Sequence, residues 1–178
     1  MKKVFYGIII LVVLYFVLAL FGPTEVKVER SIVINAPPAL VNERLGDLNY
    51  FHEQWSPWTE LDPAMKYSLS GEAGMPGHSY KWSGNKEVGT GELIIIRHNA
   101  DSLVQTLRFD DQGDAMAYYL VNGEGSNTRV TWGMYFEVGY MYRTPMLFMD
   151  MNELIGRDYE KGLMRFKQAV EKENTSGV

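Results

Sequence analysis

Apolar side chains occupy residues 4–21 without a charged interruption, directly after Lys2 and Lys3, and the run stops at Gly22-Pro23. At a helical rise of about 1.5 Å per residue the run spans roughly 27 Å, close to the ~30 Å hydrocarbon thickness of a bilayer. The pattern therefore predicts a transmembrane helix at the start of the chain.

From residue 25 to residue 139, apolar and polar positions mostly alternate with a period of two. This period is typical of strands that bury one face, and the glycine- and asparagine-rich turns between the runs favour hairpins. The predicted strands cover residues 26–34, 65–69, 77–83, 88–98, 103–109, 115–122 and 129–138.

Two other segments have helical spacing. After Pro37-Pro38, apolar residues recur at threes and fours up to Phe51, with a break near Gly46-Asp47. A longer helix is predicted from Pro145, which suits a first helical turn, to Val170. The order of elements predicts an α+β domain in which an antiparallel sheet carries its helices on one concave face.

The run at residues 4–21 has two interpretations. A cleaved signal peptide needs small residues before its cleavage site, whereas this run ends in Leu20-Phe21, and we therefore favour a retained anchor. The preceding lysines favour a cytoplasmic N-terminus and an extracytoplasmic domain, which in a bacterium lies beyond the inner membrane. The predicted organisation is a short cytoplasmic N-terminus (1–3), an anchor (4–21), a linker (22–24), one domain (25–172) and a flexible tail (173–178).

Composition restricts the partners of the domain. About 155 residues follow the anchor, which suits one domain with a self-sufficient core. The chain has 17 Lys and Arg against 22 Asp and Glu, so nucleic acid is an unfavourable partner and a polybasic lipid-binding patch is not predicted. The sequence has no cysteine, which leaves the redox environment open.

Strand parity predicts which side chains face the helices, because alternate residues point to opposite faces. We assign the bulkier set of each strand to the inside. Glu92 is ambiguous, since a bulge near Gly89 or Gly91 would reverse its direction. The inward residues that we predict to contact a ligand are His78, Tyr80, Trp82, Gln105, Leu107, Tyr118, Trp132, Met134 and Phe136; Leu103, Phe109, Met116, Leu120 and Val130 share their parity.

Plain core packing is the alternative for each of these side chains. Buried polar groups argue for a ligand or water, because an unpaired buried hydroxyl or imidazole costs about 1–3 kcal/mol. Trp55 and Trp58 have three possible roles: a packing plug under the long helix, a gate for the cavity, or a membrane-interface contact.

Groups for catalysis or metal binding are sparse. The three histidines are too far apart in sequence for a helical metal pair, and we expect no metal and no cofactor. Asp110, Asp111 and Asp114 suit a turn rather than a carboxylate site. The strongest catalytic hypothesis is His78 acting as an acid or base beside Glu92 and a tyrosine hydroxyl.

Several stretches of the chain together resemble the START-like or helix-grip superfamily, specifically its polyketide cyclase-like (SRPBCC) branch. They are residues 28–37, 55–58, 62–63, 86–92, 128–132 and 160–163. The resemblance implies a sheet curled around the C-terminal helix, with an apolar cavity between them for lipids, sterols, polyketides or similar molecules. Some relatives are enzymes and many only bind.

Three functions therefore stay open at this point. The first is a membrane-tethered binder of a lipid or another hydrophobic molecule, oriented by His78, Gln105 or Tyr118. The second is a cyclase-, dehydratase- or hydrolase-like enzyme that uses His78. The third is an envelope interaction module with a filled core and an exposed apolar patch.

Overall fold

The computed structural model describes residues 2–110 and 113–176. The helices are α1 (Lys2–Ala19), α2 (Pro38–Gly46), α3 (Leu48–Tyr50), η1 (Phe51–Trp55, π-helical), η2 (Tyr140–Tyr142, 3-10), α4 (Arg143–Met146) and α5 (Met151–Ser176). The strands are β1 (Glu25–Ile34), β2 (Lys66–Ser70), β3 (Ser79–Ser83), β4 (Thr90–Asn99), β5 (Ser102–Phe109), β6 (Gly113–Glu124) and β7 (Asn127–Glu137).

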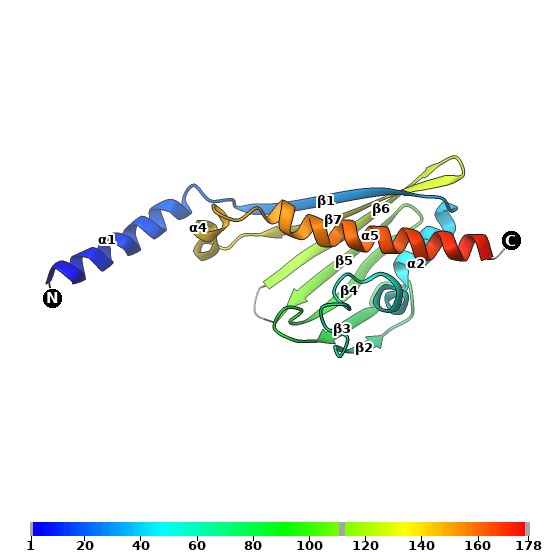
Figure 1. Cartoon of the computed structure of the whole chain (residues 1–178), viewed down its shortest axis with the longest axis horizontal. Helices are drawn as coiled ribbons and strands as arrows, with labels where there is room; N and C mark the ends of the chain where they lie inside the picture. Colours follow the sequence, from blue (N-terminus) through cyan, green and yellow to red (C-terminus); the bar gives the residue numbers. More distant parts are fainter. Residues whose placement is uncertain (1, 111–112, 177–178) are drawn as a thin grey trace.

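All seven strands form one antiparallel sheet in the order β1-β7-β6-β5-β4-β3-β2. Figure 1 shows α5 running along β1 and β7, while α2, α3 and η1 cover the same face of the sheet further along. The predicted α+β class, with an antiparallel sheet curled around a long C-terminal helix, is confirmed.

An aromatic layer fills the space between β7 and α5. The Trp132 ring stacks on Tyr159 with 3.7 Å between centroids, and Trp55 packs against both Trp132 and Phe166. Gly162 is needed at this level, because a Cβ there would lie 2.8 Å from the Trp132 ring. The core is therefore closed beneath the middle of α5.

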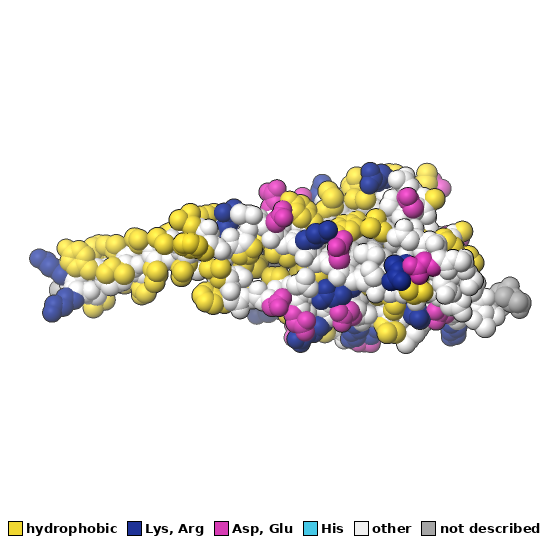
Figure 2. Space-filling model, turned by 90° about the horizontal axis from the view of Figure 1, so that it is seen from above, with side chains coloured by type: hydrophobic (Ala, Val, Ile, Leu, Met, Phe, Trp, Pro, Cys, Tyr) yellow, Lys and Arg dark blue, Asp and Glu magenta, His cyan; other side chains and the backbone are white. Residues whose placement is uncertain are grey.

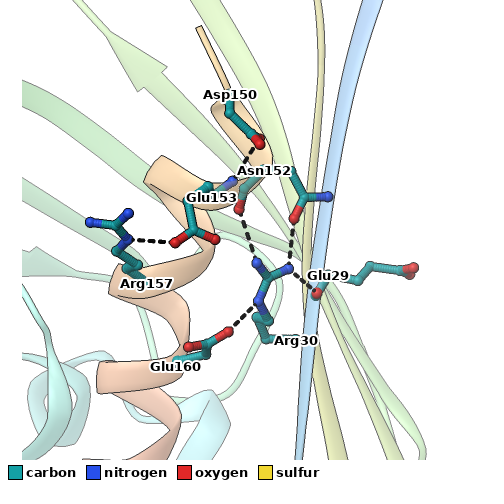
Figure 3. A network of polar contacts seen from close by, with 7 residues as sticks. All are labelled: Glu29, Arg30, Asp150, Asn152, Glu153, Arg157 and Glu160. Atoms are coloured by element: carbon teal, nitrogen blue, oxygen red, sulfur yellow. Dashed lines mark hydrogen bonds and ion pairs between the residues drawn. The ribbon is translucent and has the colours of Figure 1, made fainter.

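Arg30 ties the start of α5 to β1 (Figure 3). Its Nε donates to Glu160 Oε1 at 2.6 Å, and its two terminal nitrogens donate to the side-chain and backbone oxygens of Asn152 at 2.9 and 3.0 Å. Gly156 leaves room for the guanidinium, which would collide with a Cβ at that position. A charged side chain is thus held between strand and helix by four hydrogen bonds, the fourth of them to Glu29 O.

The single helix predicted from Pro145 is wrong, because the structure has two helices with a break at residues 147–150. Asp150 explains the restart, since its side chain accepts a hydrogen bond from Glu153 N at 2.9 Å and so caps α5. The predicted flexible tail is also too long. Residues 173–176 are helical, and Glu173 forms an ion pair with Arg44, while residues 177 and 178 lie outside the described part of the chain.

Helix α1 extends away from the rest of the molecule and exposes apolar side chains along its length (Figures 1 and 2). It is long and apolar enough to cross a membrane, with a mean hydropathy of 2.1. Its last turns contact the domain, where Tyr15 and Phe16 meet η2 and α4.

Candidate hydrophobic site on the inner face of the sheet

Strand register places six inward residues in one row across the sheet. His78 directly precedes β3, and its carbonyl accepts a hydrogen bond from Ile95 N at 2.9 Å. From that point the pairings continue from strand to strand. The row consists of His78, Ile95, Gln105, Ala117, Met134 and Val28, and all six are buried. We call it the polar row, because it contains His78 and Gln105.

A second row lies two residues nearer the start of β1 and therefore nearer α1. It consists of Tyr80, Leu93, Leu107, Ala115, Phe136 and Val26. We call it the apolar row, because apart from the Tyr80 hydroxyl its side chains carry no polar group. The register shows that both rows belong to the same face of the sheet.

Burial decreases along this face toward α1. Ile95 and Gln105 of the polar row are 0% and 1% exposed, whereas Leu93 and Leu107 of the apolar row are 6% and 7% exposed. Phe136 is only half-buried. Still nearer α1, Trp82 and Phe109 are half-buried as well and contact each other edge to face. The inner face is thus buried at its distal part, and at the end that adjoins α1 the side chains of Phe136, Trp82 and Phe109 are partly exposed.

Two buried acceptor atoms lie in the polar row. His78 Nδ1 is 3.0 Å from Ser70 O, and since a carbonyl only accepts, Nδ1 donates this hydrogen bond, so in a singly protonated imidazole Nε2 is an acceptor. Among the described residues, neither His78 Nε2 nor Gln105 Oε1 has a hydrogen-bond partner. Unpaired buried acceptors cost about 1–3 kcal/mol each, so a bound hydroxyl or amine would be stabilised here.

The parity predicted for β6 is wrong. Tyr118 lies on the outer face, together with Met116 and Leu120, and the inward residues are Ala115, Ala117, Tyr119 and Val121. The Tyr118 ring covers Gly133 of β7 and its hydroxyl donates to Glu29 on β1. This hydrogen bond lowers the pKa of Glu29, and burial raises the pKa of Tyr118. Tyr118 therefore stabilises the outer face and does not point toward the inner one.

Glu92 also lies on the outer face. Its neighbours Gly91 and Leu93 are buried, while its carboxylate pairs with Lys81 at 3.5 Å. The register shift in β4 falls between Ile95 and Arg97, beyond the glycines that we considered. The predicted His78–Glu92 pair is therefore wrong, since the two side chains leave the sheet on opposite faces.

Trp55 is 1% exposed and packs beneath α5, which contradicts a gate or membrane-interface position and agrees with the packing-plug alternative. Trp58 is partly buried beside Phe51 and Trp132. Asp114 pairs with Arg108 at 3.7 Å at the start of β6, as expected for a residue next to a turn, and Asp111 lies outside the described residues.

His52 lies on η1 and packs against the inner face of the sheet, a position that the sequence analysis did not predict. Its Nδ1 lies 2.8 Å from the Tyr80 hydroxyl, and its ring stacks on Tyr67 at 3.7 Å. Burial is the main cause that lowers the pKa of His52 and raises the pKa of Tyr80. The predicted helix ended at Phe51, one residue before His52, whereas in the structure helical geometry continues through Trp55.

An antiparallel sheet that grips a long helix and presents an apolar inner face with few polar groups defines the helix-grip class of α+β proteins. Residues 25–171 match the family described as polyketide cyclase / dehydrase and lipid transport, and the chain belongs to that family. Among curated proteins, no sequence matches this chain significantly.

Solved structures with the same fold are distant in sequence. A protein of unknown function from Staphylococcus aureus is 13% identical with a TM-score of 0.64, and the match covers 85% of this chain and 96% of that one. The di-domain ARO/CYC protein of the steffimycin biosynthetic pathway is 9% identical with a TM-score of 0.63, covering 87% and 53%. A major latex-like protein from Panax ginseng is 16% identical with a TM-score of 0.53, covering 85% and 99%. At these identities the likeness establishes the fold alone.

Proposed function

We propose that the protein is a membrane-tethered binder of a lipid or another hydrophobic small molecule. The observation that carries the proposal is the change of burial along the inner face, from the buried polar row to the partly exposed side chains of Phe136, Trp82 and Phe109 at the end beside α1. An apolar ligand could lie along Leu107 and Phe136 and direct a hydroxyl or amine to His78 and Gln105. The family description, which includes lipid transport, supports the same class of ligand.

The position of α1 supports a tethered rather than a freely diffusing protein. Its last turns form hydrogen bonds with the segment before α5, so the folded domain uses α1 as a packing partner, which a cleaved signal peptide would not provide. Lys2 and Lys3 favour a cytoplasmic N-terminus, which supports a domain on the other side of the membrane.

A surface hollow of about 580 Å³ lies at the same end, between residues 23–27 and 146–152. Its lining includes Met146, Met149 and Met151, whose flexible thioether side chains adapt to apolar molecules of different shape. A hollow with both apolar and polar lining thus lies where a ligand would arrive from the adjacent leaflet.

The test compares two arginine substitutions in the full chain, purified in detergent from native membranes. Phe136→Arg places a charge on the inner face, whereas Met116→Arg is the matched control on the outer face, where Met116 is 49% exposed. Organic extraction followed by mass spectrometry should recover a hydrophobic molecule with the unmodified protein and with Met116→Arg. We expect at least a tenfold lower yield with Phe136→Arg, and equal yields from both variants would contradict the proposal.

A second candidate is catalysis by His78, favoured by its buried Nε2 acceptor on the inner face and by the cyclase / dehydrase part of the family description. An acid or base at this position acts without Glu92, which lies on the opposite face. If the bound molecule is also converted, His78→Gln should abolish turnover while the molecule still binds. Unchanged turnover in His78→Gln would exclude this role.

A further inference from the structure

The segment between β7 and α5 holds the end of α1. Thr144 Oγ1 donates to Tyr15 O and Tyr140 Oη donates to Phe16 O, both at 2.7 Å, and Tyr15 Oη donates to Met141 O. The rings of Phe16 and Tyr140 stack at 6.0 Å with 13° between their planes. We call residues 139–149 the docking segment.

These contacts fix the depth of the docking segment along α1. Tyr15 lies four residues before the end of α1 and six before the end of the apolar run, which corresponds to roughly 6 and 9 Å along a helix axis. If residues 4–21 occupy the hydrocarbon core, groups hydrogen-bonded to Tyr15 and Phe16 lie below the membrane surface. The docking segment therefore cannot stay entirely in the aqueous phase.

The composition of the docking segment fits that depth. Six of its side chains are large, apolar or aromatic, and well exposed: Tyr140, Met141, Tyr142, Leu147, Phe148 and Met149. Phe148 is 80% exposed, which is unfavourable in water. Figure 2 shows the hydrophobic surface of α1 continuing onto the adjacent end of the domain.

Arg143 is the one charged residue of the docking segment, and it lies where a headgroup contact is expected. Its Nε donates to Val138 O at 3.2 Å, and its guanidinium lies 5.7 Å from the centre of the Tyr140 ring. Its backbone lies against Gly22, which follows the apolar run directly. Aromatic rings with a cation beside them are typical of the boundary between headgroups and acyl chains.

We propose that the docking segment is a second membrane-embedded element, which inserts Met141, Tyr142 and Phe148 into the outer part of the bilayer beside α1. The inference rests on the tethering part of the proposed function and is independent of any ligand. It assigns the exposed apolar patch to lipid rather than to a protein partner, because the patch is continuous with α1 and lies at bilayer depth.

The test uses single-cysteine labelling, since the natural chain has no cysteine. Phe148→Cys, Val12→Cys and Leu120→Cys are each labelled with the fluorophore NBD and reconstituted as full chains in vesicles of phosphatidylcholine and phosphatidylglycerol. Leu120 is the matched control, because it is an exposed apolar residue on the outer face of the sheet. Doxyl groups on the lipid acyl chains then quench only fluorophores within the bilayer.

We expect doxyl lipids to quench the labels at positions 12 and 148 at least twofold, and to leave the label at position 120 unchanged. Quenching at 12 without quenching at 148 would overturn the inference while leaving the anchor in place. A lack of quenching at both positions would overturn the inference together with the tethering. Each label replaces an exposed side chain, so a failure to fold is not expected, and circular dichroism checks it.

Discussion

His52 illustrates how the fold sets the chemistry of a single side chain. Burial against Tyr67 and Tyr80 is the main reason that the pKa of His52 lies below its ordinary value of 6.5. The unfolded chain therefore binds this proton at a higher pH than the folded protein does. Stability from this group is present above pH 6.5 and decreases as the pH falls through the lowered pKa.

Replacement of His52 should remove that pH dependence. Thermal unfolding of the natural protein should show a lower Tm at pH 5.5 than at pH 7.5, and His52→Gln should show a smaller difference between the two. The carboxylates whose pKa values are lowered, Glu29 and Glu173, titrate below their ordinary value of 4.5 and contribute little in this window. An identical pH dependence in both proteins would contradict the prediction.

Replacement of Gln105 tests whether its buried side-chain oxygen lacks a hydrogen-bond partner when no ligand is bound. In protein from which any bound hydrophobic molecule has been extracted, Gln105→Leu should raise the free energy of unfolding by about 1 kcal/mol, because it removes an unpaired buried oxygen while keeping the volume similar. The same variant should retain less of the co-purified molecule. Chemical denaturation and the extraction assay measure the two effects, and a destabilised variant would show that Gln105 is satisfied within the protein.

At the scale of residues, the sequence predicted the inward face correctly in strands whose side chains are clearly larger on one face than on the other. The inward positions of Tyr80, Gln105 and Trp132 agree with their parity. The rule failed in β6, because Ala115 and Ala117 are small yet buried, while the ring of Tyr118 is needed to cover Gly133 on the outer face. A large side chain that covers a glycine of the neighbouring strand cannot be predicted from the pattern of either strand alone.

At the scale of elements, α5 shows a conflict between intrinsic propensity and packing. Glycine within a helix is disfavoured relative to alanine by about 1 kcal/mol, so Gly162→Ala would stabilise an isolated helix. Here the added Cβ would meet the Trp132 ring at 2.8 Å. We expect Gly162→Ala to destabilise the protein by about 1–3 kcal/mol, as overpacked cores do.

Met164→Ala is the matched control for that experiment, since Met164 belongs to the same helix and is 50% exposed. Its effect on the free energy of unfolding should stay within about 0.5 kcal/mol. Urea denaturation of both variants would decide the matter, and a stabilised Gly162→Ala would mean that Trp132 can move aside.

The elements themselves were largely predictable, because strand and helix periods are strong signals in this chain. The break between α4 and α5 was not, since Leu147 and Phe148 continue the apolar spacing of a helix. Their exposure shows that they serve a different surface from the one that α5 buries. A periodic pattern alone does not distinguish apolar side chains that face the core from apolar side chains that are exposed on the surface.

At the scale of the whole molecule, the core and α1 are separable. Among the described residues, the core cluster contains no residue of α1, although Ala19 at the end of α1 is buried, and the family match begins at residue 25. A fragment of residues 24–178 should therefore fold and unfold cooperatively, with a Tm lower by a few degrees because the contacts with Tyr15 and Phe16 are lost.

The same fragment should associate in water, because its docking segment is no longer beside α1 or lipid. Phe148→Ser within the fragment should keep it monomeric at concentrations at which the unmodified fragment forms dimers or larger species. Light scattering measures the difference. Association that is unaffected by Phe148→Ser would mean that another surface is responsible.

The location of the partly exposed end of the inner face could not have been predicted from the sequence. Residue patterns indicated an inner face and an anchor separately, but their relation depends on strand order and on contacts between residues more than 120 positions apart. Residues 22–24 connect α1 to β1 along the chain, and the docking segment adds direct contacts with α1.

If α1 and the docking segment both lie in the bilayer, the domain cannot rotate about residues 22–24, and β1 acts as a spacer of set length. Its ten residues extend roughly 33 Å away from the end of α1, and the hairpin between β6 and β7 lies at the far end of the molecule from the N-terminus (Figure 1). With α1 upright in a bilayer, that hairpin is carried at a constant height above the lipid. Any layer, sheath or neighbouring complex at that height would meet the same few residues, Glu124 to Asn127, on every copy.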